Sequence, residues 1–200
     1  MVEKKKFFSI ELPKIEQKAE LLASNEQDLI GRTVKIDLTR KLRGKSAELV
    51  YKIILEDGKL KADFYRLSIL GYFIRRIMRK SVNYVEDSFS ATCKDAVLRI
   101  KPFIITRKKV FRSVRKALRE KAKKEIEESI RNLSYEEIFS ELISGKFQRA
   151  LGLKLKKIYP PAFCDIRDIY VEKKQETKVK EEKIVAWLKS ILKIKKAKDF

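Results

Sequence analysis

The pattern that most restricts the fold is an alternation of apolar and polar residues on both sides of Asp57-Gly58. In residues 47–55 every second side chain is apolar, and residues 59–65 repeat this pattern after the pair. A period of two is that of a β-strand with one buried face, and Asp-Gly is typical of a two-residue turn because both turn positions favour positive φ. We therefore predict a β-hairpin that turns at Asp57-Gly58. Its inward side chains are Ala47, Leu49, Tyr51, Ile53, Leu55, Leu60, Ala62 and Phe64.

Three further segments carry strand patterns. Residues 33–38 alternate around Val34, Ile36 and Leu38, and residues 163–171 alternate near the end of the chain. A second hairpin is predicted from residues 82–93 and 96–106, with its turn at Lys94-Asp95. Pro102 lacks an N–H group, so we expect it at a sheet edge or a bulge.

The helical segments lie between these strands. Apolar residues three and four apart predict helices over residues 68–80, 107–131 and 147–158, the last of them stopped by Pro160-Pro161. Ser134 and Glu137 form a capping-box pattern that begins another helix, which Gly145 closes.

This order of elements indicates an α+β fold. We expect an antiparallel, partly barrel-like sheet of two hairpins, with packed amphipathic helices and basic terminal extensions. The predicted organisation is a basic arm at 1–30, an α+β core at 31–173, and a charged linker with an amphipathic C-terminal helix at 174–200.

The charge of the chain indicates its class of partner. It has 49 Lys and Arg against 28 Asp and Glu, a formal net charge of +21. Solubility needs a net charge of only about 2–8 on a small domain, and a larger excess makes a compact domain repel itself unless a polyanion neutralises it. A nucleic acid is therefore the predicted partner.

Several classes of site are excluded by the residues present. The chain has no histidine, and its two cysteines, Cys93 and Cys164, form no CxxC pair. Zinc-finger spacings, serine-type triads and Cys–His pairs therefore cannot form, so we predict no catalytic residue, no metal and no cofactor. We interpret the cysteines as buried thiols in a reducing compartment. No signal-peptide pattern opens the chain, and the apolar run near residues 67–74 is shorter than the ~20 residues that span a bilayer. An intracellular, soluble protein is expected.

The segment 107–124 is the predicted centre of nucleic-acid binding, because it holds ten cations and one acid, Glu120. On a helix, Lys108, Arg112, Arg115 and Arg119 would share one face, next to an apolar stripe of Val110, Phe111, Val114 and Leu118. A solvated helix face normally mixes charges of both signs, whereas a row of guanidinium groups suits a phosphate backbone. The predicted RNA-binding residues are Lys4, Lys5, Lys6, Arg75, Arg76, Arg79, Lys80, Arg107, Lys108, Lys109, Arg112, Arg115, Lys116 and Arg119.

Two of these expectations have alternatives. The cations at 75–80 end a predicted helix, where they would also complement its dipole. The aromatic residues mostly fit core positions, among them Phe64, Phe103 and Phe111, although Phe7 or Phe8 in the basic arm could stack on bases. With no DNA-reading motif and no RNA-recognition-type aromatic motif, the pattern favours binding of structured RNA by shape and backbone.

Five segments also resemble one known family in the same order. They are Lys6-Phe7-Phe8-Ser9-Ile10 with Pro13, Ile30-Gly31-Arg32-Thr33, Arg75-Arg76 with Arg79-Lys80, Lys156-Lys157-Ile158-Tyr159-Pro160, and Asp168-Ile169-Tyr170-Val171-Glu172-Lys173. The chain is similar over about residues 5–173 to the small-subunit ribosomal proteins called S-three-A-e or e-S-one, found in archaea and eukaryotes. The last two segments carry the most specific part of the likeness, and the short chain resembles the archaeal form.

The resemblance implies a structural constituent of the small ribosomal subunit, cytoplasmic and ribosome-bound, and not an enzyme. It implies a place on the platform near the mRNA exit, with small-subunit rRNA and neighbouring platform proteins as partners. Messenger RNA near the exit and initiation factors are further partners that it suggests.

Two other functions remain open at this stage. One is a free-standing RNA-binding or RNA-chaperone protein, which the charge alone would equally favour. The other is a membrane-surface protein, because Trp187 and the isoleucines of residues 184–194 alternate with lysines as in a basic amphipathic helix. We favour the ribosomal protein, without membrane contact.

Overall fold

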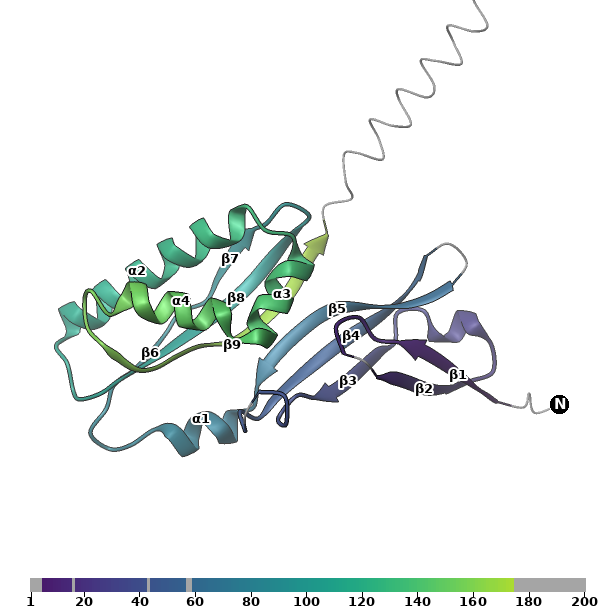
Figure 1. The fold of residues 1–200 in the computed structure, drawn as a ribbon, viewed down its shortest axis with the longest axis horizontal. Coiled ribbons are helices and arrows are strands. Elements are labelled where there is room, and N and C mark those ends of the chain that lie inside the picture. Colours follow the sequence, from purple (N-terminus) through teal and green to yellow (C-terminus); the bar gives the residue numbers. More distant parts are fainter. Residues whose placement is uncertain (1–4, 16, 43, 57–58, 175–200) are drawn as a thin grey trace, which may run out of the picture.

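The computed structural model describes residues 5–15, 17–42, 44–56 and 59–174. Figure 1 shows an α+β fold, which confirms the predicted class. The strands are β1 (Lys6–Glu11), β2 (Lys18–Ala23), β3 (Thr33–Asp37), β4 (Ala47–Glu56), β5 (Lys59–Ile69), β6 (Tyr84–Glu86), β7 (Phe89–Thr92), β8 (Ala96–Thr106) and β9 (Pro161–Lys174). The helices are the 3-10 helix η1 (Glu26–Leu29), α1 (Gly71–Ile77), α2 (Arg112–Arg131), α3 (Tyr135–Ser144) and α4 (Lys146–Leu155).

Seven strands form one open antiparallel sheet, in the order β3-β4-β5-β9-β8-β6, with β7 also paired to β8. The late strand β9 lies between β5 and β8, so it joins two hairpin-based halves. β9 pairs with β8 along the whole of that strand but with β5 over only Arg66–Ser68. The sheet is therefore continuous, but few backbone pairs join its two halves.

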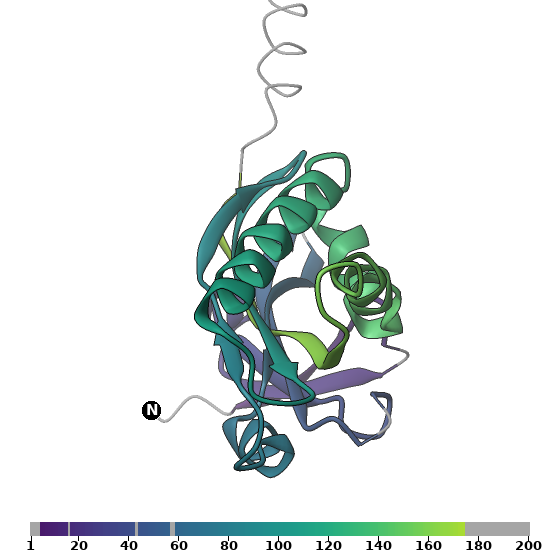
Figure 2. The same ribbon diagram turned by 90° about the vertical axis from the view of Figure 1, so that its left-hand side faces the viewer.

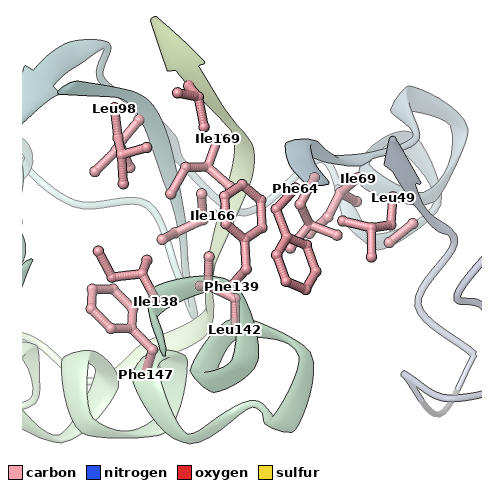
Figure 3. Close-up of a cluster of buried hydrophobic side chains, with 14 of the residues drawn as sticks. Leu49, Phe64, Ile69, Leu98, Ile138, Phe139, Leu142, Phe147, Ile166 and Ile169 are labelled. Carbon is pink, nitrogen blue, oxygen red and sulfur yellow. The ribbon is translucent and has the colours of Figure 1, made fainter. Parts of the chain in front are cut away.

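The main core lies between this sheet and the helices α2, α3 and α4, which gather on one side of it (Figure 2). Phe139 of α3 stacks on Phe64 of β5 with ring centroids 5.2 Å apart, and Phe147 of α4 points into the same cluster (Figure 3). Ile138 and Leu142 complete the buried face of α3. The periodic apolar positions expected for this helix are thus the ones that meet the sheet.

The first predicted hairpin is present, and β4 and β5 pair from Glu56↔Lys59 onward. Asp57-Gly58, its predicted turn, lies outside the described residues. Leu55 is 49% exposed, so its prediction as a core residue was wrong. β5 also continues to Ile69, where Leu67 and Ile69 still pair with β4, so the predicted helix over 68–80 is reduced to α1.

The second hairpin is present as well, and Cys93 and Ala96 close its turn through a backbone N–H···O=C bond of 2.9 Å. Its first strand is split into β6 and β7 opposite Pro102, because proline cannot donate to a neighbouring strand. The register of β8 on β9 shifts between Lys101 and Pro102, which confirms the expected bulge.

The segment before β3 forms a second, two-stranded sheet from β1 and β2. Ile10, Leu12 and Ile15 are buried, and the Tyr51 hydroxyl donates to the Pro13 carbonyl at 2.7 Å. Within the described ranges, no helix is both long and apolar enough to cross a membrane. Lys4 and the predicted C-terminal helix lie outside those ranges.

Candidate nucleic-acid interface

The first two turns of α2 form one wall of a surface groove of about 690 Å³. The helix lies against β6 and β7, and β6 supplies the opposite wall with Tyr84 and Val85. The helix residues that line the groove are Arg112, Ser113, Arg115, Lys116 and Arg119. Four of these five side chains are cations, so the groove can neutralise a polyanion along its length.

The cations of the groove are placed by the spacing 112, 115, 116 and 119, which keeps one face of a helix. Arg112, Lys116 and Arg119 are exposed, whereas Arg115 is half-buried. Glu120 lies 3.9 Å from Lys116, but both side chains are largely exposed and such a pair contributes little. Three positive charges therefore face solvent without a strong partner among the residues that the structure describes.

The helix begins at Arg112 and not at residue 107, so Lys108 does not continue its basic face. Residues 107–110 are held in a loop by two hydrogen bonds, one local and one from a distant part of the chain. The buried Thr106 hydroxyl donates to the Lys108 carbonyl at 2.7 Å, and the Val110 N–H donates to Asn83 Oδ1 at 2.7 Å. These bonds use backbone groups that a longer helix would need. Phe111, expected in the apolar stripe, is 85% exposed, so that prediction was wrong.

A second basic cluster lies at the same end of the molecule, around the end of α1 (Figure 1). Arg75 and Arg76 are on α1, while Arg79 and Lys80 follow it, and all four are exposed. The two clusters are joined through Asn83, whose backbone N–H donates to Thr106 Oγ1 at 2.9 Å. The structure thus brings the cations of 75–80 and 107–119 to one end.

The N-terminal lysines lie elsewhere. Lys5 and Lys6 are exposed at the opposite end of the molecule, at the start of β1 (Figure 1). Lys4 lies outside the described residues. The thirteen predicted binding residues that the structure describes therefore do not form one continuous surface.

Tyr84 is a groove residue that the sequence interpretation did not include. Burial, aided by the Glu86 carboxylate, raises the pKa of its phenol to about 12. The hydroxyl therefore keeps its proton near neutral pH and remains a hydrogen-bond donor. Arg167 of β9 pairs with Glu86 at 2.7 Å, so the carboxylate of Glu86 on this strand is compensated by a positive charge.

The remaining chemistry of the described residues is structural. No three His, Cys, Asp or Glu side chains within the described ranges lie close enough together to hold a metal ion. Cys93 is buried and donates to the Ala96 carbonyl, and Cys164 is half-buried. Burial raises the pKa of the Cys164 thiol to about 12, so it is not a nucleophilic thiolate at neutral pH.

Comparison with known proteins identifies the lineage of this fold. The sequence profile of the Ribosomal S3Ae family matches residues 1–175. The chain belongs to this family. The predicted resemblance is therefore confirmed, and as a ribosomal protein of the S3Ae family the chain is a structural component and not an enzyme.

Several archaeal S3Ae proteins are similar along most of their length. The small ribosomal subunit protein eS1 of Nanoarchaeum equitans (strain Kin4-M) is 26% identical over 181 residues, covering 86% of this chain and 91% of that protein. Proteins of the same name from Saccharolobus islandicus (strain L.S.2.15 / Lassen #1) and Saccharolobus solfataricus (strain P2) are 28% and 27% identical over 185 residues, covering 88% of this chain and 86% of each. These relatives support the archaeal form.

The sequence interpretation of this S3Ae protein missed Tyr84 of the groove and the exposure of Phe111, which directly precedes the groove residue Arg112. Tyr84 lies in a short strand whose alternation assigns no role to its hydroxyl. Phe111 fitted a helical stripe only while the helix was assumed to begin at residue 107. A usable signal was present, since an aromatic residue between Lys109 and Arg112 resembles the mixed composition of nucleic-acid surfaces.

Proposed function

We propose that this protein is a structural constituent of the small ribosomal subunit that binds rRNA through backbone phosphates. Membership of a ribosomal protein family and the name carried by its archaeal relatives support this proposal. Its place is the subunit platform near the mRNA exit, in the cytoplasm.

The observation that carries the RNA contact is the groove on α2, lined by Arg112, Arg115, Lys116 and Arg119. Guanidinium groups donate bidentate hydrogen bonds to phosphate oxygens, and a row of them on a rigid helix matches a backbone rather than a base edge. The cations around α1 extend the positive surface at the same end of the molecule.

The partners that follow from this assignment are rRNA and adjacent platform proteins. Messenger RNA at the exit and initiation factors are further partners. The cations at both ends of the molecule support more than one RNA contact, because Lys5 and Lys6 lie far from the α2 groove.

The proposal is tested first by the salt dependence of RNA binding. If the protein neutralises even six phosphates, raising the salt from 50 to 200 mM should lower its RNA affinity about a thousandfold. The reason is that the release of counterions from the RNA is less favourable at high salt. Filter binding of the whole protein to a structured small-subunit rRNA fragment measures this slope. A flat response would refute phosphate binding.

The groove itself is tested by the triple variant Arg112→Glu, Lys116→Glu and Arg119→Glu. Arg115 is left intact because it is half-buried. Each lost phosphate contact should reduce the salt slope by about one. The matched control is Arg149→Glu, Lys156→Glu and Lys157→Glu, three exposed cations in and just after α4 that change the net charge equally. Equal losses in both variants would show that only total charge matters.

A free-standing RNA-binding protein would pass both of these tests, since it needs the same basic groove. Sedimentation of the tagged protein from cell extract through a high-salt sucrose gradient separates the two functions. A ribosomal constituent stays with the small subunit, whereas a free-standing binder remains near the top of the gradient.

A further inference from the structure

Phe111 is the most exposed large hydrophobic side chain of the described residues, at 85%. It occupies the N-cap position of α2, where Ser, Thr, Asp or Asn would bond a free backbone N–H, and it makes no such bond. The residue thus contributes neither core packing nor a helix cap. A side chain that serves no folding need on an otherwise regular element suggests a role in binding.

The backbone that carries this ring is fixed on both sides. The Val110 N–H is bonded to Asn83 Oδ1 at 2.7 Å, and the Phe111 carbonyl accepts from the Arg115 N–H at 3.2 Å. Asn83 is itself bonded to the buried Thr106. A side chain presented from an anchored backbone loses less conformational entropy when it binds.

The surroundings of the ring indicate the chemistry of its partner. Lys108, Lys109 and Arg112 flank it and are exposed, and the α2 groove begins with Arg112. Arg115 also lines the groove, and its buried Nε has no hydrogen-bond partner among the described residues. An apolar pocket on another protein would have to accept these cations together with the ring. A nucleic acid offers a flat apolar base and a phosphate side by side.

We propose that Phe111 stacks on an unpaired RNA base while the phosphates next to that base lie in the α2 groove. This inference rests on the proposed rRNA-binding function and adds to it a preference for a bulged or looped nucleotide. Bases in a paired A-form helix are inaccessible to a side-chain ring, so only an unstacked base can be bound in this way. Stacking accepts any base, because every base has a π-face.

This role fits Phe7, the other strongly exposed phenylalanine of the described residues, less well than Phe111. Phe7 is 73% exposed on β1, where it pairs across the hairpin with Leu22, itself 43% exposed. It lies at the opposite end of the molecule from the groove (Figure 1). Phe7 therefore provides a matched control, as an exposed phenylalanine near lysines but without a phosphate-binding groove.

The test compares two blunt-ended RNA duplexes of two strands each, which have no loop and differ only in one bulged uridine, with the whole protein at fixed salt. Phe111→Ala should weaken binding to the bulged duplex about 5- to 100-fold, the effect of losing one base–aromatic stack. Binding to the fully paired duplex should not change. Phe111→Tyr should keep the preference for the bulge, whereas Phe111→Leu, apolar but without a ring, should lose most of it. Phe7→Ala should behave as the wild type on both duplexes.

Photocrosslinking gives an independent readout. A 5-iodouridine at the bulge should crosslink to the peptide that contains Phe111 in the wild type, and this crosslink should be absent from Phe111→Ala. If Phe111→Ala weakens binding equally on both duplexes, or on neither, the proposal is overturned. It is also overturned if Phe111→Ala binds both duplexes normally but is incorporated poorly into small subunits, since that result would assign Phe111 to a protein neighbour. If the wild type binds neither duplex in a salt-dependent manner, the rRNA-binding function itself fails.

Discussion

Asp63, Asp165 and Asp168 are acidic side chains buried on the two strands that join the halves of the sheet. Lys45 bonds Asp165 at 2.7 Å, and Lys174 pairs with Asp63. Asp168 of β9 accepts two bonds of 2.8 Å from Arg66 on β5 and lies 3.3 Å from Lys101 on β8. One carboxylate therefore links three strands, at the place where β5 and β9 pair through only three residues of each strand.

The Asp168 side chain should consequently be important for stability. In Asp168→Asn the amide nitrogen would face the donors of Arg66 or Lys101, and a buried charged hydrogen-bond network would be broken. We expect a loss of about 2 kcal/mol, or about 4–8 °C in melting temperature for a chain of this size. Thermal unfolding followed by far-UV circular dichroism measures this shift.

The control is Glu172→Gln on the same strand. Glu172 bonds Arg99 at 2.7 Å, but this pair is partly exposed to solvent, so its removal should change the melting temperature little. A similar shift in both variants would contradict a special role for the buried carboxylate. The sequence alternation of β9 could not reveal this role, because it does not distinguish an acid that faces solvent from one that joins three strands.

At the scale of elements, local signals were the reliable ones. The Ser134 N–H bonds Glu137 at 2.9 Å and the Glu137 N–H bonds Ser134 at 3.3 Å, which confirms the predicted capping box. Gly145 closes α3 with a φ of +73°, as its position predicted. Element boundaries were wrong where residues distant in the chain bond the same backbone. The Asn83 side chain bonds the Val110 N–H before α2 begins, and β4 pairs with Ser68 and Ile69, which the sequence pattern had assigned to a helix.

Glu125 joins two helices, since it accepts from Lys121 of its own helix α2 at 2.7 Å and from Lys154 of α4 at 2.6 Å. The bonds to Lys121 and Lys154 lower the pKa of its carboxyl below the ordinary value. A group whose pKa is lowered by folding stabilises the fold above its ordinary pKa of 4.5, and this contribution is lost as the pH falls through the lowered value.

Glu125→Gln should therefore lower the melting temperature at pH 7, and the difference from the wild type should shrink below about pH 4.5. Both lysine side chains are nearly half exposed, so solvent screening limits the effect to about 1 kcal/mol, or about 2–4 °C. Melting curves from pH 3 to pH 7 measure the difference. Glu120→Gln, an exposed acid on the same helix, should show no such dependence, and a gap for Glu125→Gln that persists at pH 3 would contradict the ionic origin.

At the scale of the whole molecule, composition predicted the class of partner and the likeness to the ribosomal family predicted the lineage, but neither located the surface. The cations at 75–80 and 107–119 are about thirty residues apart in the chain, and they lie at the same end of the molecule because β6 to β8 return the chain there. The exposed ring of Phe111 depends on the same return, through Asn83. Positions fixed by long-range contacts are those that a single sequence does not reveal.

The described core ends at β9, and its last three residues, Glu172 to Lys174, are exposed. Lys174 still contributes to the core, because it pairs with Asp63 and its ammonium lies 4.9 Å from the centre of the Tyr135 ring. The family match ends one residue later, at 175. The separation of residues 174–200 from the core stays a prediction, because the residues after Lys174 lie outside the described ranges, and Lys174 itself contacts the core.

Ending the chain after Lys174 should therefore leave the melting temperature of the core within about 2 °C of the full chain and reduce retention on the small subunit. The residues removed carry a predicted apolar helix face of Ile184, Trp187, Ile191 and Ile194, and a helix of about 17 residues is marginal in water unless something covers that face. The full-length control Ile184→Ser, Trp187→Ser and Ile191→Ser keeps every lysine, so it separates apolar docking from loss of charge. Retention is measured by sedimentation in a salt gradient. A large fall in melting temperature on truncation, or blue-shifted Trp187 fluorescence in the free monomer, would instead show that this segment packs on its own core.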